Sequence, residues 1–307
     1  MRVLITGGSG LIGHALSADL ATAGHEVIVL SRRPEQVAGL PSGVRAERWD
    51  SRTGQGWSSL INGDTAIVNL AGESLSAGRW TDESKQKILQ SRLSAGQAVV
   101  QAVQASPVKP SVVLQASAVG YYGPRGDEEV TEEAPPGSGF LPGVAIQWEA
   151  TTAPVEAWGV RRVVTRSGVV LSLKGGAFPR LLQPYRFFVG GPLGSGRQWF
   201  SWIHLADEAG AMRFLLENPA AQGAFNLTSL QPLTNAAFGK VLGRVLGRPS
   251  LIPVPALALR LLFGEMSTVL LDGQRVLPSR LLALGYQFRF PQAEVALRNL
   301  LKEVEAA

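Results

Sequence analysis

A glycine-rich turn close to the N-terminus has the residue spacing of a nucleotide-binding loop. Thr6-Gly7-Gly8-Ser9-Gly10-Leu11-Ile12-Gly13 follows a short apolar run and precedes a stretch with helical periodicity. Gly8 and Gly10 have no Cβ to keep a pyrophosphate from the backbone, and Gly13 lets the helix pack closely on the strand. The N–H groups that open the helix attract phosphate. We therefore predict a dinucleotide site that contains Gly7, Gly8, Ser9, Gly10, Leu11, Ile12 and Gly13.

The end of the second apolar run indicates which dinucleotide is bound. A site for NAD usually has Asp or Glu here, because a carboxylate binds both ribose hydroxyls and repels a 2′-phosphate. This sequence has Ser31 and Arg32 instead, followed by Arg33. A hydroxyl and a guanidinium bind a phosphate well, so we predict NADP as the cofactor. The alternative is a pair of solvated arginines at a strand end.

A third segment, Asn69-Leu70-Ala71-Gly72-Glu73, is expected to lie beside the same cofactor. Its small residues let the ribose and adenine pass close to the sheet, and Asn69 can tie neighbouring strand ends together. Lys87 and Arg92 lie farther along, on a long predicted helix. They add positive charge to the cofactor site if that helix faces it, and form a solvated face if it does not.

Short β-branched runs alternate with helical stretches in the first half of the chain. Strands are predicted at residues 2–5, 26–30, 66–70, 112–115 and 160–165, and helices at 11–23 and 81–104. This alternation indicates βαβ units, so the predicted fold class is α/β, a Rossmann-like, doubly wound parallel sheet.

After about residue 171 the sequence becomes rich in Gly, Pro and aromatic residues, with helices predicted at 235–246, at 256–263 and from about 291. We therefore expect an NADP-binding domain over residues 1–170, its sheet completed by segments from 205–230. A smaller, mostly helical lobe over residues 171–307 is expected to close over the carboxyl edge of the sheet.

Composition excludes several classes of protein. The chain has 307 residues, of which 45% are hydrophobic and 17% charged, with no Cys and three His. Disulfides, thiolate zinc sites and a cysteine nucleophile are therefore excluded, and no metal site is predicted. The net charge of +5 is spread along the chain, which favours a small anionic ligand over nucleic acid. With no leader or membrane span expected, we predict a cytoplasmic monomer or homodimer with a small-molecule substrate.

Longer strings make the sequence resemble a known superfamily. The glycine turn, Asn69-Leu-Ala-Gly72 and Ser117-Ala-Val-Gly-Tyr-Tyr122-Gly123 resemble the extended short-chain dehydrogenases/reductases, which include sugar-nucleotide epimerases. A narrower likeness is to the atypical, NADP-binding "epimerase family" proteins that carry a short C-terminal domain of unassigned function. It covers essentially the whole chain and rests on Gly72-Glu73, Arg79-Trp80, Ser91-Arg92-Leu93, Arg166 to Leu171, Gly190 to His204, Thr234-Asn235 and Gly273 to Pro278.

The resemblance implies a Rossmann domain and a native substrate that has not been established. It also implies cofactor contacts at Ser31, Arg32, Leu70, Ala71, Lys87 and Arg92. Members of the superfamily use a Tyr as acid/base with a Lys four residues later. When the corresponding helix is registered on Trp148-Glu149, Leu141 and Ala145 occupy those two positions, so this proton relay is missing.

Several other residues are candidates to replace the missing relay. Ser117 is at the strand end where the superfamily places a Ser or Thr that polarises a carbonyl, and Ser117 is also expected to contact the cofactor. Tyr121 or Tyr122 could act as a substitute acid, or pack as a buried tyrosine. We name Ser117, Tyr122 and His204 as candidate catalytic residues, the last because the pKa of ~6.5 of histidine suits proton transfer.

Two residues are candidates for contacting the substrate, namely Tyr121 and Arg197. Arg197 lies in a glycine-rich loop, where it could bind an anionic substrate or stack on Trp199 or Trp202.

Three functional hypotheses remain open at this point. The first is an NADP-dependent oxidoreductase or epimerase-like enzyme acting on a carbonyl or hydroxyl compound. The second is a non-catalytic NADP-binding sensor or scaffold that has lost the proton relay. The third, an authentic NAD-linked sugar-nucleotide epimerase, requires the Tyr and Lys that this sequence lacks.

Overall fold

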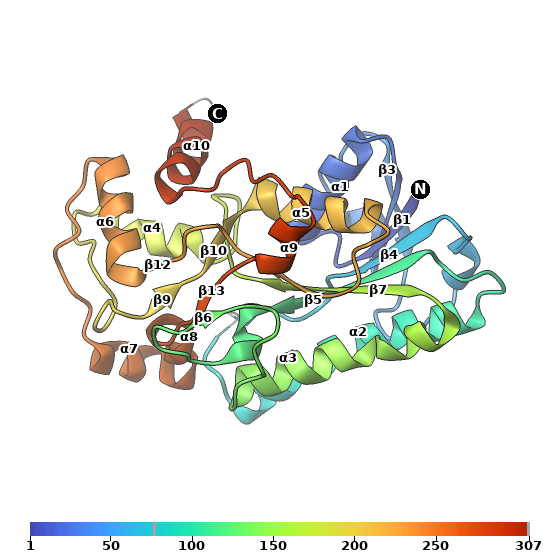
Figure 1. The fold of residues 1–307 in the computed structure, drawn as a ribbon, viewed down its shortest axis with the longest axis horizontal. Coiled ribbons are helices and arrows are strands. Elements are labelled where there is room, and N and C mark those ends of the chain that lie inside the picture. Colours follow the sequence, from blue (N-terminus) through green and yellow to red (C-terminus); the bar gives the residue numbers. More distant parts are fainter. Residues whose placement is uncertain (76–77, 306–307) are drawn as a thin grey trace.

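A seven-stranded parallel sheet forms the centre of the computed structural model, which describes residues 1–75 and 78–305 (Figure 1). The last two residues of the expected 171–307 lobe lie outside the described ranges. The strand order is β11-β7-β5-β4-β1-β2-β3. Every neighbouring pair is parallel. The strands are β1 (Arg2–Thr6), β2 (Glu26–Ser31), β3 (Val44–Arg48), β4 (Thr65–Asn69), β5 (Val112–Ala118), β7 (Arg161–Ser167) and β11 (Gly223–Leu227).

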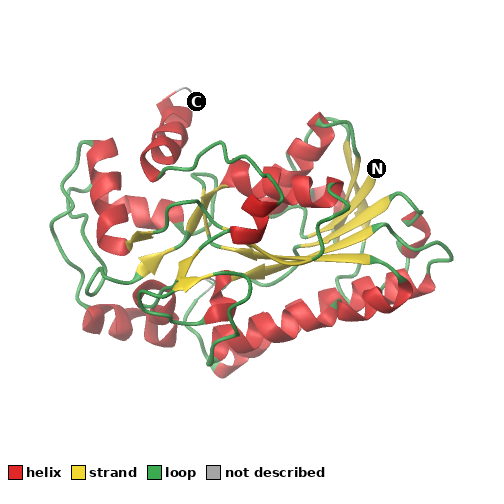
Figure 2. Cartoon of the chain, viewed as in Figure 1, coloured by secondary structure: helices red, strands yellow, loops and turns green. Residues whose placement is uncertain are grey.

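Helices cover both faces of this sheet, as the predicted doubly wound fold requires. Helices α1 (Leu11–Thr22) and α5 (Leu205–Glu217) pack together on one face, and α2 (Asp82–Ala105) and α3 (Phe140–Thr151) lie on the other (Figure 2). The alternation of side chains along β1 divides the core accordingly: Val3 and Ile5 pack with Leu16 of α1, whereas Leu4 packs with Val99 of α2. The predicted α/β class is therefore confirmed.

The C-terminal part forms a mostly helical region beside the carboxyl edge of the sheet (Figure 1). Its helices are α4 (Phe178–Arg186), α6 (Asn235–Leu246), α7 (Ala256–Phe263), α8 (Thr268–Leu271), α9 (Ser279–Ala283) and α10 (Ala293–Glu305). The short strands pair as β8 (Val169–Leu171) with β10 (Trp202–His204), β9 (Trp199–Phe200) with β12 (Leu233–Thr234), and β6 (Glu129–Val130) with β13 (Arg275–Val276). A second core joins Leu182 of α4, Leu242 of α6 and Leu297 of α10.

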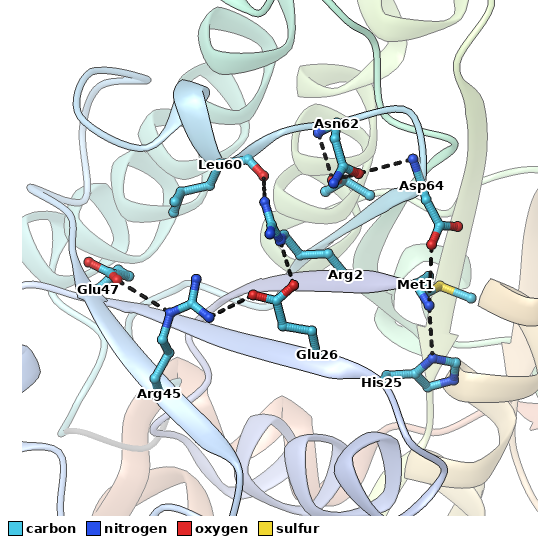
Figure 3. A network of polar contacts seen from close by, with 10 residues as sticks. Met1, Arg2, His25, Glu26, Arg45, Glu47, Leu60, Asn62 and Asp64 are labelled. Atoms are coloured by element: carbon cyan, nitrogen blue, oxygen red, sulfur yellow. Dashed lines mark hydrogen bonds and ion pairs between the residues drawn. The ribbon is translucent and has the colours of Figure 1, made fainter.

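The amino edge of the sheet is fastened by an ionic network (Figure 3). Arg2 Nε lies 2.8 Å from Glu26 Oε2, Arg45 Nη1 lies 2.6 Å from Glu26 Oε1, and Arg2 Nη1 donates to the carbonyl of Leu60 at 2.9 Å. Hydrogen bonds from Arg2 and then Arg45 lower the pKa of Glu26. These contacts join the starts of β1, β2 and β3, at the edge opposite to the glycine turn.

None of the helices in residues 1–75 and 78–305 has the length and hydropathy of a transmembrane span.

Candidate functional site

The glycine turn joins β1 to α1 with its N–H groups free of side-chain caps. Gly10 is the N-cap residue of α1, it makes no side-chain hydrogen bond, and the first turn of the helix contains no acidic side chain. Both features leave the positive end of the helix available to an anion. The turn therefore has the donor set that a pyrophosphate requires.

Because Gly13 has no side chain, α1 can pack closely against the end of β1, the strand that precedes it. A Cβ at residue 13 would lie 2.5 Å from the carbonyl oxygen of Gly7 and 2.6 Å from Cα of Gly8. Gly7 has a φ of +72°, and a Cβ there would lie 2.8 Å from the carbonyl carbon of Leu70. The turn is thus pressed between α1 and the segment that follows β4, which leaves no space for side chains at Gly7 and Gly13.

The strand order reverses at β1, which pairs with β2 on one side and β4 on the other. In open α/β sheets ligands bind in the crevice at such a switch point. Here Thr6 Oγ1 donates to Asn69 Oδ1 at 2.7 Å, and Asn69 Nδ2 donates to Gln115 Oε1 at 2.9 Å. The predicted role of Asn69 in tying strand ends is confirmed, and the bonds align β1, β4 and β5. Leu70 and Ala71 follow directly and are partly exposed, while Gly72 and Glu73 are exposed.

The end of β2 carries a group of arginines. Ser31 is half-buried, Arg32 and Arg33 are exposed, and Arg48 at the end of β3 donates to the carbonyl of Arg32 at 3.5 Å. Arg48 also pairs with Glu35 at 3.3 Å, whereas none of the ion pairs found in the described part of the chain includes Arg32. The guanidinium of Arg32 therefore remains available to a ligand phosphate.

Arg92 is a buried cation beside the crevice. Only 9% of it is exposed, and its Nη1 donates to the carbonyls of Glu73 and Ile88, both at 3.0 Å. Its guanidinium carbon lies 4.8 Å from the centre of the Trp148 ring. Burial lowers the pKa of Arg92 to about 10, and no carboxylate among residues 1–75 and 78–305 pairs with it. Such a cation requires an anion to offset its desolvation.

Lys87 and Arg92 were predicted together as cofactor contacts, but the structure places them in different surroundings. Lys87 is exposed, its Nζ lies 2.6 Å from Glu83 Oε1, and it does not line the cavity described below. Of these two predicted cofactor contacts, Arg92 lies at the cavity and Lys87 does not.

A cavity of about 460 Å³ lies at the carboxyl edge of the sheet, between α3 and the C-terminal region. The ends of β5 and β7 reach it through Ala118 and Ser167, and Leu141, Ala145 and Trp148 of α3 form one wall. Leu141 and Ala145, the residues that the sequence places at the positions of the usual Tyr and Lys, therefore both face this cavity. Neither side chain can transfer a proton.

Beneath the cavity, Ser117 belongs to a buried polar network. Its Oγ donates to Glu149 Oε1 at 2.6 Å, and Glu149 also accepts from Arg166 Nε at 2.8 Å and Nη2 at 2.9 Å. Burial alone would lower the pKa of Arg166, but the hydrogen bonds and charge of Glu149 raise it above its ordinary value. The Ser117 hydroxyl is thus engaged by a carboxylate, and it is absent from the residues that line the cavity.

Both candidate tyrosines contact the same network. Tyr122 is fully buried, its hydroxyl donates to Asn226 Oδ1 at 2.7 Å and accepts from Arg166 Nη1 at 3.0 Å, and burial raises its pKa. Tyr121 stacks under the guanidinium of Arg166, 3.5 Å from ring centre to carbon. Neither tyrosine lines the cavity, so the packing interpretation fits both better than the role of acid or substrate contact.

His204 and Arg197 also lie away from the cavity wall. His204 is the N-cap of α5: its Nδ1 accepts from the N–H of Ala206 at 3.1 Å, and its ring packs 3.9 Å from that of Phe290. Burial lowers its pKa to about 4, so the imidazole is neutral near pH 7. Arg197 is exposed, and the guanidinium that stacks on Trp199 belongs to Arg275, at 4.8 Å.

Two acidic residues near the site were missed from the sequence. Glu149 lies in the last turn of α3 and is partly buried, and Glu208 in the first turn of α5 is 0% exposed. Glu149 is the single charged residue of α3, and that was the available signal. Glu208 follows Asp207 in a helix that carries other charged residues, so the sequence does not mark it. Glu208 Oε1 lies 2.5 Å from the Oγ of Ser167, a cavity-lining residue, and its Oε2 has no hydrogen-bond partner among the described residues. Burial raises the pKa of Glu208 to about 8.

The sheet order, the glycine turn at the switch point and the buried cation together define a Rossmann-type dinucleotide-binding protein. The model of the NAD dependent epimerase/dehydratase family matches residues 3–228, and a domain of unknown function (DUF1731) matches residues 254–300. The chain belongs to this epimerase/dehydratase family, and the resemblance inferred from its motifs is confirmed.

Similar proteins match over the whole chain. It is 38% identical over 304 residues to the epimerase family protein YfhF of Bacillus subtilis, with 99% of each chain covered. It is 37% identical to human epimerase family protein SDR39U1 (isoform 2), whose crystal structure contains NADPH, with a TM-score of 0.89 and coverage of 98% of this chain and 99% of that one. UDP-glucose 4-epimerase from Thermus thermophilus, solved with NAD, shares the fold at a TM-score of 0.78 and 20% identity.

The close packing at Gly13 predicts a cost for adding one methyl group. Gly13→Ala should lower the free energy of unfolding by about 1–3 kcal/mol, because α1 must move away from the backbone of the turn. Gly143→Ala, inside α3, is the matched control: its Cβ would meet nothing within 4 Å, so it should raise stability by about 0.5–1 kcal/mol. Urea unfolding measures both changes. Equal stabilities of the two variants would contradict the packing argument.

Glu208 predicts a pH dependence of stability. Its folded-state pKa of about 8 lies above the ordinary value of 4.5, so between these values the folded chain binds a proton that the unfolded chain does not. Stability should therefore fall as pH rises from ~5 to ~8, by about 1 kcal/mol per pH unit. Glu208→Gln should remove this component, which is measured as the difference between the urea-unfolding free energies of the two proteins. Parallel pH curves would show that Glu208 is ionised in the folded protein.

Proposed function

We propose that this chain is an NADPH-binding oxidoreductase that transfers hydride between the nicotinamide and a carbonyl or hydroxyl compound. The observation that carries the proposal is the buried guanidinium of Arg92, which lines the cavity and hydrogen-bonds to two carbonyls beside an aromatic ring. The exposed Glu73 acts on it through its charge, but no carboxylate among the described residues forms an ion pair with it. The two phosphates of a dinucleotide would supply negative charge in direct contact with the guanidinium. The uncapped start of α1 would bind the same phosphates from the other side of the crevice.

The residues at the end of β2 support NADP over NAD. A ribose that follows from the glycine turn reaches this strand end, where Ser31, Arg32 and Arg48 offer donors and no carboxylate occupies residues 31–33. A 2′-phosphate would accept from Ser31 Oγ and from the fork of Arg32. The similar human protein SDR39U1 was crystallised with NADPH, which agrees with this choice.

A bound NADPH would supply the hydride, and the chain's own residues supply position and shelter. Apolar side chains of α3 form one wall of the cavity, and the ends of β5 and β7 form its floor. Ser117 is held by Glu149, and Glu149 by Arg166, so this network fixes α3 against the sheet. Its role here is to position the wall of the cavity.

Leu141 and Ala145 also favour a second candidate function, a non-catalytic NADPH sensor. A sensor would bind the cofactor and oxidise none of it in a single turnover with any carbonyl compound. An enzyme would oxidise bound NADPH with at least one member of a panel of aldehydes, ketones and quinones. The same measurement therefore separates the two candidates.

Arg32→Ala tests the choice of cofactor. Loss of a charge-assisted contact should raise the Kd for NADPH by about 10- to 100-fold and leave the Kd for NADH almost unchanged. Arg45→Ala is the matched control, because it removes the same charge at the opposite edge of the sheet (Figure 3). Isothermal titration calorimetry measures both constants. NADP specificity would be refuted if the unaltered chain bound NADPH and NADH equally well, or if Arg32→Ala raised both Kd values by the same factor.

A further inference from the structure

The cavity wall is built largely from flat aromatic and aliphatic side chains. Trp80, Phe140, Trp148, Trp199 and Phe200 all line it. Trp80 and Phe140 meet edge to face, with ring centres 5.0 Å apart. Aromatic walls of this kind favour a planar ligand that packs against ring faces and edges.

Charged groups on the wall are unsuited to a substrate that carries phosphates. Arg92 is the only basic residue among the described lining residues, and the proposed function assigns it to the phosphates of the cofactor. The other charged lining residues, Glu265 and Asp272, are acidic, and Glu265 pairs with Lys85. A sugar nucleotide would bring its diphosphate to a wall without a free cation. The wall therefore selects against it and in favour of an uncharged molecule.

The wall also lacks the usual Tyr and Lys to donate a proton to an alkoxide. The hydroxyls of Ser167, Ser201 and Thr268 on the wall are already engaged as donors, to Glu208 and to the carbonyls of Gln274 and Glu265 respectively. Leu141 and Ala145 occupy the turn of α3 that faces the cavity, and no Tyr, His, Lys or Cys is present among the described lining residues. The hydroxyls of Ser117 and Tyr122 are bonded to Glu149 and Asn226 beneath the wall. The remaining carboxyl of Asp272 is exposed at the rim.

Carbonyl compounds differ greatly in how much they need such a donor. Hydride addition to an aliphatic aldehyde or ketone forms an alkoxide, whose conjugate acid is about as weak an acid as water. Hydride addition to a quinone forms a phenolate, whose conjugate acid has a pKa of ~10, as for tyrosine. The phenolate is stable enough to form without an adjacent acid and to take its proton from water afterwards.

We propose that the substrate of this cavity is an uncharged quinone, a planar dicarbonyl compound that the aromatic wall can enclose. The inference rests on the proposed function, which supplies NADPH as the reductant. A hydride, which is one proton with two electrons, passes from the reduced nicotinamide to the quinone. The products are NADP⁺ and the monoanion of the hydroquinone, which then takes one proton from water. The balance is quinone plus NADPH plus one proton, giving hydroquinone plus NADP⁺.

Steady-state oxidation of NADPH by the intact chain tests the proposal with menadione, benzaldehyde and cyclohexanone as probes. Menadione should react at least about 100-fold faster than the other two, after subtraction of the rate without protein. Its kcat should stay constant between about pH 6 and 9, because no acid on the wall takes part. Comparable rates with benzaldehyde or cyclohexanone, or a kcat that falls as a wall carboxyl or Glu208 loses its proton, would overturn the proposal.

Binding gives a second readout that does not depend on turnover. Menadione should quench the fluorescence of the wall tryptophans. Trp80→Ala should weaken its binding about tenfold, and Trp80→Phe should retain most of it, while the Kd for NADPH stays the same in both. If NADPH itself fails to bind, the proposed function is wrong. If NADPH binds and menadione neither quenches nor reacts, the assignment of the substrate alone is wrong.

Discussion

The close approach of α1 to the end of β1 is the constraint on which the candidate site depends. Gly13 allows this approach, because a Cβ there would lie 2.5 Å from the carbonyl oxygen of Gly7. The approach aims the uncapped N–H groups of α1 at the crevice between β1 and β4. Hydrogen bonds through Asn69 then align β1, β4 and β5 at the same edge. The positions of the glycine turn and of the cavity floor are therefore set more by backbone geometry than by individual side chains.

A buried ion pair binds the hydroxyl groups that were candidates for acid/base chemistry. Glu149 and Arg166 join α3 to β7, and they engage the hydroxyls of Ser117 and Tyr122. Removing either partner would leave a buried charge unpaired, which costs far more than the pair contributes. These residues are therefore bound to each other and do not line the cavity, which is why the proposed reaction relies on the cofactor and on the substrate itself.

The features that could be predicted best from the sequence are those that depend on a local pattern of residues. The glycine turn, β1, β2 and α2 were found because glycine spacing and apolar periodicity report directly on backbone conformation. β3 was missed because Val44-Arg45-Ala46-Glu47-Arg48 is a charged edge strand without an apolar run. α5 was missed because most of its residues are buried, so that no exposed polar face marks its helical period.

Side-chain roles at the site were harder to predict, because they depend on contacts between distant segments. Tyr122 and His204 have the chemistry of catalysts, but Asn226 and Arg166 surround the first and Phe290 the second. The partners come from segments far apart in the chain, which no motif can reveal. The resemblance predicted a cofactor contact at Arg92, and the structure adds that Arg92 lines the cavity with no carboxylate of the described residues in an ion pair with it.

The path of the chain between its two halves limits how the molecule can move. After β7 the chain leaves the sheet for β8 and α4, comes back as α5 and β11, and leaves again for α6. The β6 and β13 pair adds a further link. The chain crosses between the two halves three times, and one strand pair also links them. These connections disfavour a hinge motion that would separate the halves as rigid bodies. The cavity is partly open to the surface, so a small molecule can enter it while the scaffold stays unchanged.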